Sequence, residues 1–343
     1  MKFLYVLVSS ESDFYYEQAL ISMMSAKFQM PNCSISLLTE RETGNNLKGS
    51  RDLINEYISE KKVIDMDASL SPMQKSRWLK TFMRELIKDD FLYVDVDTVF
   101  AAPIDESLFS KDIMGVPDGN CPLKNHPMKW FIEDNLKKVH FDNTLDYHIN
   151  SGVLFFKDTP IAHSFAQKWH EKWLESCQKG IYIDQPALHR TIAEFGDIFN
   201  ILPDFMNAQF GRNINTLAKG VILHYYSSWG NISSYTPAYK FLQKEWLEAF
   251  RNNPKSEVFT NLIKNPKEAF DQNTFIIGKK ENYLFNSKSM SQLMNIRIDS
   301  TDRADRRIYK ILITQNRIIT FFYYKFLSFF SPLYRQTHKK ISN

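Results

Sequence analysis

The chain is predicted to adopt an α/β fold in which a mostly parallel central sheet is flanked by helices. Through the first hundred residues, short apolar runs alternate with segments of helical spacing. That alternation is typical of parallel strands joined by helical crossovers. Four consecutive apolar residues at 91–94 (Phe-Leu-Tyr-Val) indicate a strand that is covered on both faces. Ligands of such folds bind outside the carboxyl ends of the strands, so polar residues at those ends are candidates for function.

The elements expected along the chain follow from apolar spacing. In the segment 74–87 the apolar residues recur every three or four positions, which predicts an amphipathic helix. The later segment 235–285 has helical character with Pro and Asn breaks, and we assign no boundaries to it. The other predicted helices are 14–27, 52–60, 162–174 and 185–195. The predicted strands are 2–9, 33–39, 62–66, 91–100 (interrupted by two aspartates), 113–116, 148–157 and 221–225.

Composition places the chain among folded globular proteins, with 43% hydrophobic and 24% charged residues. The length allows one large α/β domain with an appendage. Three widely spaced cysteines form no CxxC pair, which fits a reducing, cytoplasmic compartment. The apolar run at 3–8 is too short for a signal peptide, and no stretch reaches the roughly 18 apolar residues of a membrane span. Nothing resembles a nucleic-acid-binding module.

Asp95 and Asp97 interrupt the predicted strand at 91–100 and are separated by one residue. At the carboxyl end of a buried strand, both carboxylates can turn toward the same small volume. Two carboxylates that close repel each other unless a cation lies between them. A hard divalent metal ion that carries a phosphate would supply this cation. The alternative is a polar strand end or an Asx turn without a ligand.

Four further segments place polar residues beside apolar runs. Asp118 ends Gly-Val-Pro-Asp, and Asn150 opens Asn-Ser-Gly before a buried strand. The pair Asp184 and Gln185 stands at the start of a predicted helix, where an Asp also caps free amides. His224 follows the apolar run Val-Ile-Leu.

In this order the five landmarks resemble the nucleotide-diphospho-sugar glycosyltransferases of the GT-A fold. The resemblance is strongest to family 8, which includes glycogenin and bacterial lipopolysaccharide galactosyl- and glucosyltransferases. It covers about residues 1–230, two thirds of the chain. It implies a Rossmann-like, mostly parallel sheet and a UDP-sugar donor.

The resemblance also implies a metal site. Asp95 and Asp97 match the motif that holds Mn²⁺ or Mg²⁺ against the donor diphosphate, and Val96 between them belongs to the donor site. His224 matches the distant histidine that completes the ligand set. A set with an imidazole suits Mn²⁺ better than Mg²⁺, which is the harder ion. The alternative for His224 is a strand-end histidine bonded to the backbone.

For the nucleotide, the resemblance points to residues on two early elements. Ser9, Ser10 and Tyr15 follow the first strand, where related enzymes hold uracil and ribose; ordinary loop and capping roles are the alternative. Arg77 and Lys80 lie three residues apart on a predicted helix, where related enzymes reach the donor phosphates or sugar. A solvated basic surface is the alternative for this pair.

The donor hexose is assigned to the later landmarks. Asp118, Asn150 and Asp184 match positions that bind its hydroxyl groups, with capping or turn formation as the alternative. Gln185 matches the residue beside the anomeric carbon. Because an amide is a poor nucleophile, we expect it to orient and stabilise an oxocarbenium-like centre. Asp184 and Gln185 are therefore the candidate catalytic residues.

The chain departs from the family after His224. Relatives continue with Gly-x-x-Lys-Pro-Trp, whose Lys grips a donor phosphate, whereas this chain reads Tyr-Tyr-Ser-Ser-Trp-Gly. Lys219, Lys240 or the C-terminal tail are candidates to replace that Lys. The departure leaves a sister family open.

Three regions are expected: a catalytic domain at 1–235, a helical extension at 236–296, and a basic tail at 297–343. The tail carries ten Lys/Arg and three Asp, whereas the rest carries 33 Lys/Arg and 36 Asp/Glu. Within 307–330 the polar residues fall on one helical face, opposite Ile, Leu and Phe, a pattern typical of an interfacial membrane helix. A helix packed on the catalytic domain is the alternative.

Together these features predict a metal-dependent glycosyltransferase. It would move a hexose from a UDP-sugar to a hydroxyl of a glycan or lipid-linked glycan, with retention, in lipopolysaccharide or capsule biosynthesis. It would be cytoplasmic, with peripheral association to an anionic membrane surface. A degenerate transferase acting as a sugar-nucleotide-binding scaffold is one alternative. A haloacid-dehalogenase-type phosphatase also uses Asp-x-Asp, but after its first strand.

Overall fold

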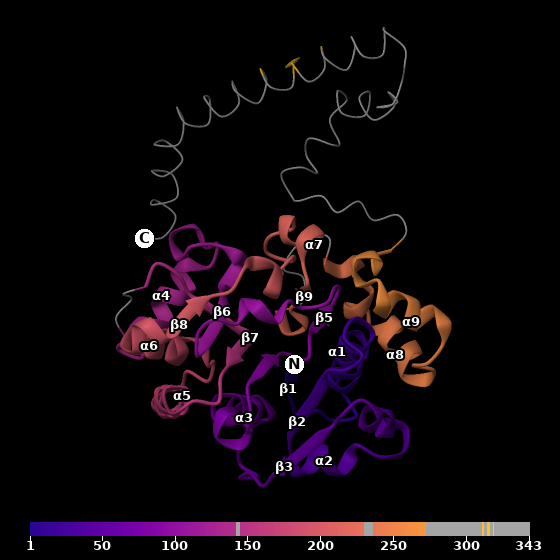
Figure 1. Ribbon diagram of the computed structural model, residues 1–343, viewed down its shortest axis with the longest axis horizontal. Helices are drawn as coiled ribbons and strands as arrows, with labels where there is room; N and C mark the ends of the chain where they lie inside the picture. Colours follow the sequence, from indigo (N-terminus) through magenta and orange to yellow (C-terminus); the bar gives the residue numbers. More distant parts are fainter. Residues whose placement is uncertain (142–144, 230–235, 272–310, 312–313, 316–317, 319–343) are drawn as a thin grey trace, which may run out of the picture. The chain divides into compact units, whose positions relative to one another are not determined.

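A computed structural model describes residues 1–141, 145–229, 236–271 and four positions of the tail (Figure 1). The chain divides into two compact units, residues 1–276 and 277–343. The predicted tail at 297–343 lies outside the described residues except for those four positions, and so does 272–296 of the predicted extension. Among the helices that the structure describes, none has the length and apolar content needed to span a bilayer.

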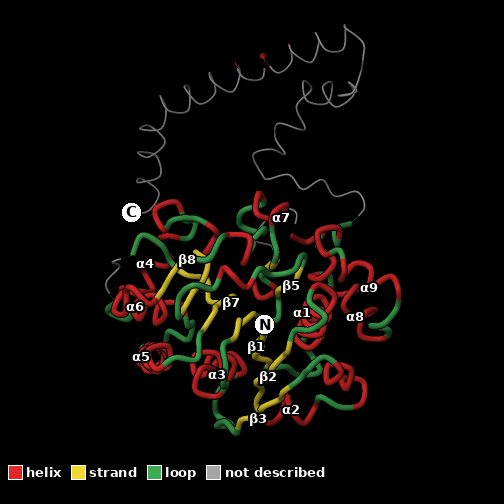
Figure 2. Tube along the Cα trace, viewed as in Figure 1, coloured by secondary structure: helices red, strands yellow, loops and turns green. Residues whose placement is uncertain are grey.

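A seven-stranded sheet with the order β3-β2-β1-β4-β7-β6-β8 forms the centre of the first unit (Figure 2). Six strands run in the same direction, and β7 alone is antiparallel to its neighbours β4 and β6. The predicted mostly parallel α/β fold is thereby confirmed. The strands are β1 (Lys2–Leu7), β2 (Ser34–Glu40), β3 (Glu60–Ile64), β4 (Phe91–Val94), β6 (Ile113–Pro117), β7 (Ile149–Phe156) and β8 (Phe199–Ile201).

Alternate residues of β1 enter different cores, because successive side chains of a strand point to opposite faces. Phe3, Tyr5 and Leu7 pack with α1 (Tyr15–Gln29) on one face. Leu4 and Val6 lie in a second core on the other face. That core contains residues of α3 (Pro72–Leu86), α5 (Pro160–Gln178) and α6 (Gln185–Phe195). Both faces of the sheet are therefore covered by helices.

A separate two-stranded ribbon continues from the end of β4. The strand β5 (Thr98–Phe100) pairs antiparallel with β9 (Ile222–His224), so that Thr98 lies opposite His224. The two segments are far apart in the sequence and become adjacent only through this pairing.

Most predicted elements are confirmed, and several were missed. The helix predicted at 52–60 is a 3-10 segment at Gly49–Glu56, and β3 begins two residues before its predicted start. The exposed alternate residues of β3 explain this difference, because an edge strand lacks a continuous apolar run. The elements without a sequence prediction are α2 (Arg41–Asn46), α4 (Lys129–Lys138), β8 and α7 (Asn215–Lys219).

The region after residue 236 shares its core with the sheet domain. Its helices are α8 (Lys244–Asn252) and α9 (Glu257–Lys264). Tyr239, Phe241 and Phe250 are buried in the same apolar cluster as α1. The described part of the predicted extension therefore belongs to the first compact unit.

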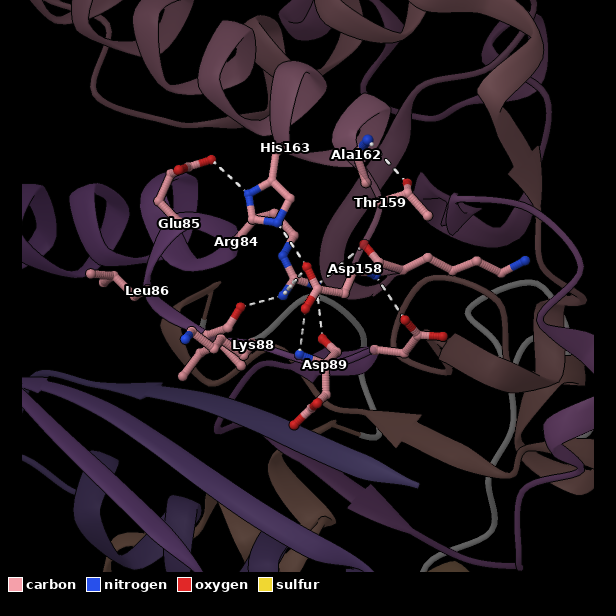
Figure 3. Close-up of polar contacts among 12 residues, drawn as sticks. Arg84, Glu85, Leu86, Lys88, Asp89, Asp158, Thr159, Ala162 and His163 are labelled. Atoms are coloured by element: carbon pink, nitrogen blue, oxygen red, sulfur yellow. Dashed lines mark hydrogen bonds and ion pairs between the residues drawn. The ribbon is translucent and has the colours of Figure 1, made fainter.

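A buried arginine joins the end of α3 to the chain around β7 (Figure 3). Arg84 is fully buried, donates to the carbonyl oxygens of Asp89 (2.9 Å), Lys157 (3.2 Å) and Ile87, and lies 3.5 Å from Asp158. His163 of α5 lies between Asp158 (2.8 Å) and Glu85 (3.1 Å). These contacts fix α3, which carries Arg77 and Lys80, against α5.

Candidate functional site

The ribbon of β5 and β9 brings His224 to the aspartate pair. Asp97 immediately precedes β5, and its carbonyl accepts from the Tyr225 amide at 3.2 Å. On the other side, the amide of Asp95 donates to the Gly152 carbonyl of β7 at 2.8 Å. Both aspartates therefore leave the sheet at its carboxyl end, between β7 and the ribbon.

Ligand atoms of Asp95, Asp97 and His224 all lie within 4.8 Å of one another. His224 Nε2 is 3.3 Å from Asp97 Oδ1, and both side chains are largely buried. A Cβ atom on Gly152 would lie 2.5 Å from His224 Cε1 and 2.9 Å from Asp95 Oδ2, so only glycine leaves this space open. Two carboxylates and an imidazole around a space kept free by glycine fit a divalent transition-metal ion.

Asp97 is held in its ionised form. Burial by itself would raise the pKa of the Asp97 carboxyl, but the charge and hydrogen bond of His224 and two hydrogen bonds from Ser227 lower it to about 2. The Ser227 amide donates to Asp97 Oδ2 at 2.8 Å. The carboxylate is therefore fixed in position and available as a ligand near neutral pH.

Asp95 is paired with buried groups of the first unit. Lys80 is 1% exposed and donates to the Asp95 oxygens at 3.0 and 3.2 Å, and the Tyr93 hydroxyl also donates to Asp95. Lys80 also lies 3.8 Å from Asp184. The buried Lys80 ammonium thereby compensates the negative charges of Asp95 and Asp184.

Asp184 lies at the start of α6 and faces α3. The Arg77 Nε atom is 3.1 Å from Asp184 Oδ1. Burial would raise the pKa of Asp184, but the positive charges of Lys80 and Arg77 lower it. Its Oδ2 atom is buried and has no hydrogen-bond partner among the described residues. The Asp184 side chain makes no capping bond to α6. Its Oδ2 atom, 3.8 Å from Lys80, can accept from a ligand hydroxyl.

The remaining predicted sugar residues line one pocket beside the metal cluster. Asn150 and Asp118 are hydrogen-bonded at 2.9 Å, and Gln185 donates to the Ile149 carbonyl at 3.2 Å. Residues of α4, among them Phe131 and Ile132, form the opposite wall. The space enclosed by these residues is about 40 Å³, which is less than a hexose fills.

The charge of Asp118 is stabilised inside this pocket. Burial alone would raise its pKa, but the hydrogen bond of His126 and the charge of Arg212 hold the pKa well below the usual range. His126 Nε2 is 3.0 Å from Asp118 Oδ2. Asp118 is therefore an acceptor only.

The residues predicted to hold the nucleoside differ in their surroundings: the two serines bond within their own loop, whereas the tyrosine is partly exposed. Ser9 and Ser10 bond to Asp13 at 2.7 Å, which is the loop-forming role left open from the sequence. Tyr15 is 39% exposed, and its pKa is raised by burial and by the nearby Asp97 charge. Tyr15 thus presents a ring near the aspartate pair, and Val96 is half-buried between the two acids.

Of the candidates for the missing phosphate-binding Lys, Lys219 is exposed at the end of α7 and Lys240 lies 3.9 Å from Asp271. Residues 230–235, which follow Trp229, are outside the described residues. Arg77 is closer to the acids: it interacts electrostatically with Asp184, Asp95 and Asp97.

Sequence reasoning missed several residues that build the site. Asn207 lies in a 3-10 segment and bonds to His224, while Gln209 and Tyr226 bond to each other beside Asp118. No motif marks Asn207 and Gln209, which reach the site from the chain between β8 and α7, whereas Tyr226 follows His224 by two residues. Gly152 belongs to the run Asn-Ser-Gly, and its place two residues after Asn150 is the sequence signal that could have identified it.

The sequence matches no protein-family model and none of the curated proteins compared with it. Glycosyltransferases are among the solved structures similar to the chain. GlyE of Streptococcus pneumoniae TIGR4 is 16% identical with a TM-score of 0.43, over 80% of this chain and 66% of GlyE. The galactosyltransferase LgtC, solved with donor and acceptor sugar analogues, is 14% identical with a TM-score of 0.43, over 73% of this chain and 96% of LgtC. Mouse xyloside xylosyltransferase 1 is 13% identical with a TM-score of 0.42, over 65% of this chain and 97% of the mouse protein. At these TM-scores the similarities do not by themselves establish what this chain does.

Proposed function

We propose that the protein is a metal-dependent glycosyltransferase that moves a hexose from a UDP-sugar to a hydroxyl of a glycan or lipid-linked glycan, with retention at the anomeric carbon. One observation carries this proposal. The Asp95–Asp97–His224 cluster lies at the carboxyl end of β4, beside buried acids and amides suited to sugar hydroxyls. A diphosphate and a hexose are the two parts of a ligand that such neighbouring sites would bind.

The three clustered residues would hold the ion, with Mn²⁺ favoured over Mg²⁺ by the imidazole. When bound, a divalent ion supplies Lewis-acid stabilisation of the charge that grows on the departing nucleotide diphosphate. Arg77 adds positive charge on the same side, because it lies against Asp184 and near Asp95. Arg77 would thereby take over part of the role of the Lys that relatives carry after the histidine.

The protein's own residues would then position the sugar. Asp184 Oδ2 has no hydrogen-bond partner among the described residues and lies 3.8 Å from Lys80, so it could accept from a hexose hydroxyl. Asn150 and Asp118 would bind further hydroxyls from the neighbouring pocket. The Gln185 amide nitrogen donates to the Ile149 carbonyl. The side-chain oxygen of Gln185 therefore remains to stabilise positive charge at the anomeric carbon. The bond from the anomeric carbon to the diphosphate breaks, the acceptor oxygen bonds to that carbon, and the departing phosphate takes the acceptor proton.

A sugar-nucleotide-binding scaffold without catalysis is the second candidate. The same residues support it, because the Asp95–Asp97–His224 cluster could hold a nucleotide diphosphate whether or not transfer follows. A haloacid-dehalogenase-type phosphatase is not favoured. Its Asp-x-Asp motif follows the first strand, whereas here the motif follows the fourth strand of the chain.

A donor panel tests the proposal. The purified protein is incubated with Mn²⁺ and each of several UDP-sugars, with and without glycan acceptors. UDP release and product mass are then measured. We expect acceptor-dependent transfer from one UDP-hexose, loss of activity with EDTA, and a decrease of at least about 100-fold for Asp97→Asn. Full activity in Asp97→Asn would show that the metal assignment is wrong. Mn²⁺-dependent UDP binding without product from any donor would favour the scaffold.

A further inference from the structure

A continuous set of side-chain hydrogen bonds joins His224 to Asp118. His224 Nδ1 is 3.1 Å from Asn207 Oδ1, and Asn207 Nδ2 is 2.9 Å from Asn150 Oδ1. Asn150 Nδ2 is in turn 2.9 Å from Asp118 Oδ1. All four residues are buried. The metal cluster and the sugar pocket are thus connected through two amide side chains.

The direction of every bond in this set follows from two groups that have only one possible role. The Asp118 carboxylate can only accept, so the NH₂ group of Asn150 must face it. The Gly152 backbone amide can only donate, and it lies 3.0 Å from Asn150 Oδ1. Asn150 is therefore held in one orientation from both sides.

This orientation is passed on to the histidine. Because Asn150 presents its oxygen to Asn207, the NH₂ group of Asn207 must face Asn150, and the oxygen of Asn207 must face His224. His224 Nδ1 consequently carries a hydrogen and donates it, which leaves Nε2 as the ring nitrogen that can bind a metal ion or a second proton. Nε2 then presents a lone pair toward Asp97 Oδ1, 3.3 Å away. Two acceptors at that distance are compatible only when a cation, a metal ion or a proton, lies between them.

The geometry points to Asn207 as a positioning residue that fixes the His224 tautomer required for metal ligation and couples the metal site to the sugar pocket. Asn207 touches neither the metal position nor the sugar. It acts by orienting the histidine on one side and Asn150 on the other. Partners that orient a ligating histidine in this way commonly change metal affinity 10- to 100-fold.

This inference rests on the proposed function, and two variants at position 207 test it. In Asn207→Leu, His224 and Asn150 lose their shared partner. In Asn207→Asp, the carboxylate still accepts from His224 Nδ1 but cannot donate to Asn150. Asn150 then cannot satisfy both Asp118 and residue 207, so only the sugar side is disturbed.

Three measurements are made on the full chain. Mn²⁺ affinity is measured with UDP present by electron paramagnetic resonance of free Mn²⁺. Affinities for UDP and a UDP-hexose are measured by calorimetry. The protonated ring nitrogen of His224 is identified from ¹⁵N chemical shifts of metal-free protein at pH 8.5, with His224→Gln for assignment. Asn120→Gly is the control, because Asn120 bonds to the backbone of Asn207 (2.9 Å) and Gln209 (2.9 Å) but not to the side-chain set.

We expect Asn207→Leu to lose Mn²⁺ affinity by about 10- to 100-fold and to lose the fixed hydrogen on Nδ1 of His224. Asn207→Asp should keep Mn²⁺ affinity within about threefold and lose the tighter binding of UDP-hexose relative to UDP. Asn120→Gly should leave all three readouts unchanged. If Asn207→Leu is not folded, Asn207→Asp alone decides, and equal affinity for UDP-hexose in it and the wild type would overturn the inference.

The tautomer separates this inference from the proposed function. A wild-type chain that binds no Mn²⁺ but shows the Nδ1–H form, lost in Asn207→Leu, would contradict the metal-dependent function and support the positioning role. Mn²⁺-dependent transfer by a protein whose His224 carries no hydrogen on Nδ1, or unchanged Mn²⁺ affinity in Asn207→Leu, would overturn the positioning role alone.

Discussion

Arg251 on α8 lies 2.6 Å from the carboxylate of Glu17 on α1, 234 positions earlier in the chain. Glu17 is fully buried. The same guanidinium donates to the Asp13 carbonyl at 2.8 Å and covers the Phe14 ring at 5.0 Å. A helix that follows the sheet domain in sequence therefore holds the loop that precedes Tyr15.

Replacing Arg251 should weaken donor binding more than turnover. Arg251→Ala leaves Glu17 buried without a partner, which costs about 3 kcal/mol of stability, and releases the loop carbonyl of Asp13. We expect the KM for the UDP-sugar to rise about 5- to 20-fold with kcat changed less than about threefold, since no group at the reacting centre is lost. Urea unfolding and steady-state kinetics measure the two effects.

Arg251→Lys and Lys255→Ala serve as comparisons. The lysine restores a charge beside Glu17 but cannot span to Asp13, so stability should recover more than KM. Lys255, which follows α8, forms an exposed pair with Glu56 of the 3-10 segment at 2.8 Å, and its loss should change neither quantity appreciably. An equal KM in Arg251→Ala and Lys255→Ala would refute a role for Arg251 at the loop.

Gly152→Ala should block the metal site without preventing folding. The added Cβ would lie 2.5 Å from His224 Cε1, so the ring must move away from Asp95 and Asp97. We expect Mn²⁺ affinity to fall at least about tenfold, as measured by titration with UDP present. Gly115→Ala is the matched control, because its Cβ would meet Leu154 (2.8 Å) and Ile149 (2.9 Å) instead of ligands. It should lose stability and keep Mn²⁺ affinity; the same loss of affinity in both variants would contradict the prediction.

Acidification should destabilise the fold partly through His170. Burial lowers the pKa of His170 from 6.5 to about 4. Between these values the unfolded chain binds more protons than the folded one, so stability falls as the pH drops from 6.5 toward 4. At 1.36 kcal/mol per pKa unit, the free energy of unfolding falls by about 3 kcal/mol once the pH is below both pKa values.

Urea unfolding of wild type and His170→Gln at pH 7 and pH 5 measures this contribution. The variant loses the hydrogen bond between Thr81 Oγ1 and His170 Nδ1 (2.7 Å) and is less stable at pH 7. Its further loss between pH 7 and 5 should be smaller than that of the wild type by about 1–2 kcal/mol. An equal decrease in the free energy of unfolding between pH 7 and pH 5 in the two proteins would show that His170 does not titrate in this range. Burial lowers the pKa of His148 and His189 as well, so part of the dependence should persist.

The basic tail should determine membrane partitioning. Residues 297–343 carry a net excess of seven positive charges, which favours an anionic lipid surface. Removing residues 300–343 should move the protein from the membrane fraction to the soluble fraction and leave UDP binding intact. Fractionation of cells and sedimentation with anionic vesicles measure the two states, and unchanged partitioning would disprove the membrane role.

The parts of this protein that could be predicted are those whose signals are local. Continuous apolar runs located β1, β2, β4 and β7, and apolar spacing located α1, α3, α5 and α6, because burial on both faces or on one stripe leaves a pattern within a few residues. The elements α4, α7 and β8 are short or have mixed polarity, and they leave no such pattern. The reversed direction of β7 also has no sequence signal, since strand direction depends on how the chain returns to the sheet.

The sequence by itself determined which polar residues stand at the carboxyl ends of buried strands. These are the aspartate pair after β4, Asp118 after β6 and His224 at the end of β9. Those positions depend only on where apolar runs end. Tertiary structure alone decided the partners of these residues. The contacts of Lys80 with Asp95, of Asn207 with His224 and of Arg251 with Glu17 join different elements that are 15, 17 and 234 positions apart in the chain. Each buried polar group needed a partner of the right polarity, and only the packing of the folded chain determined which residue would supply it.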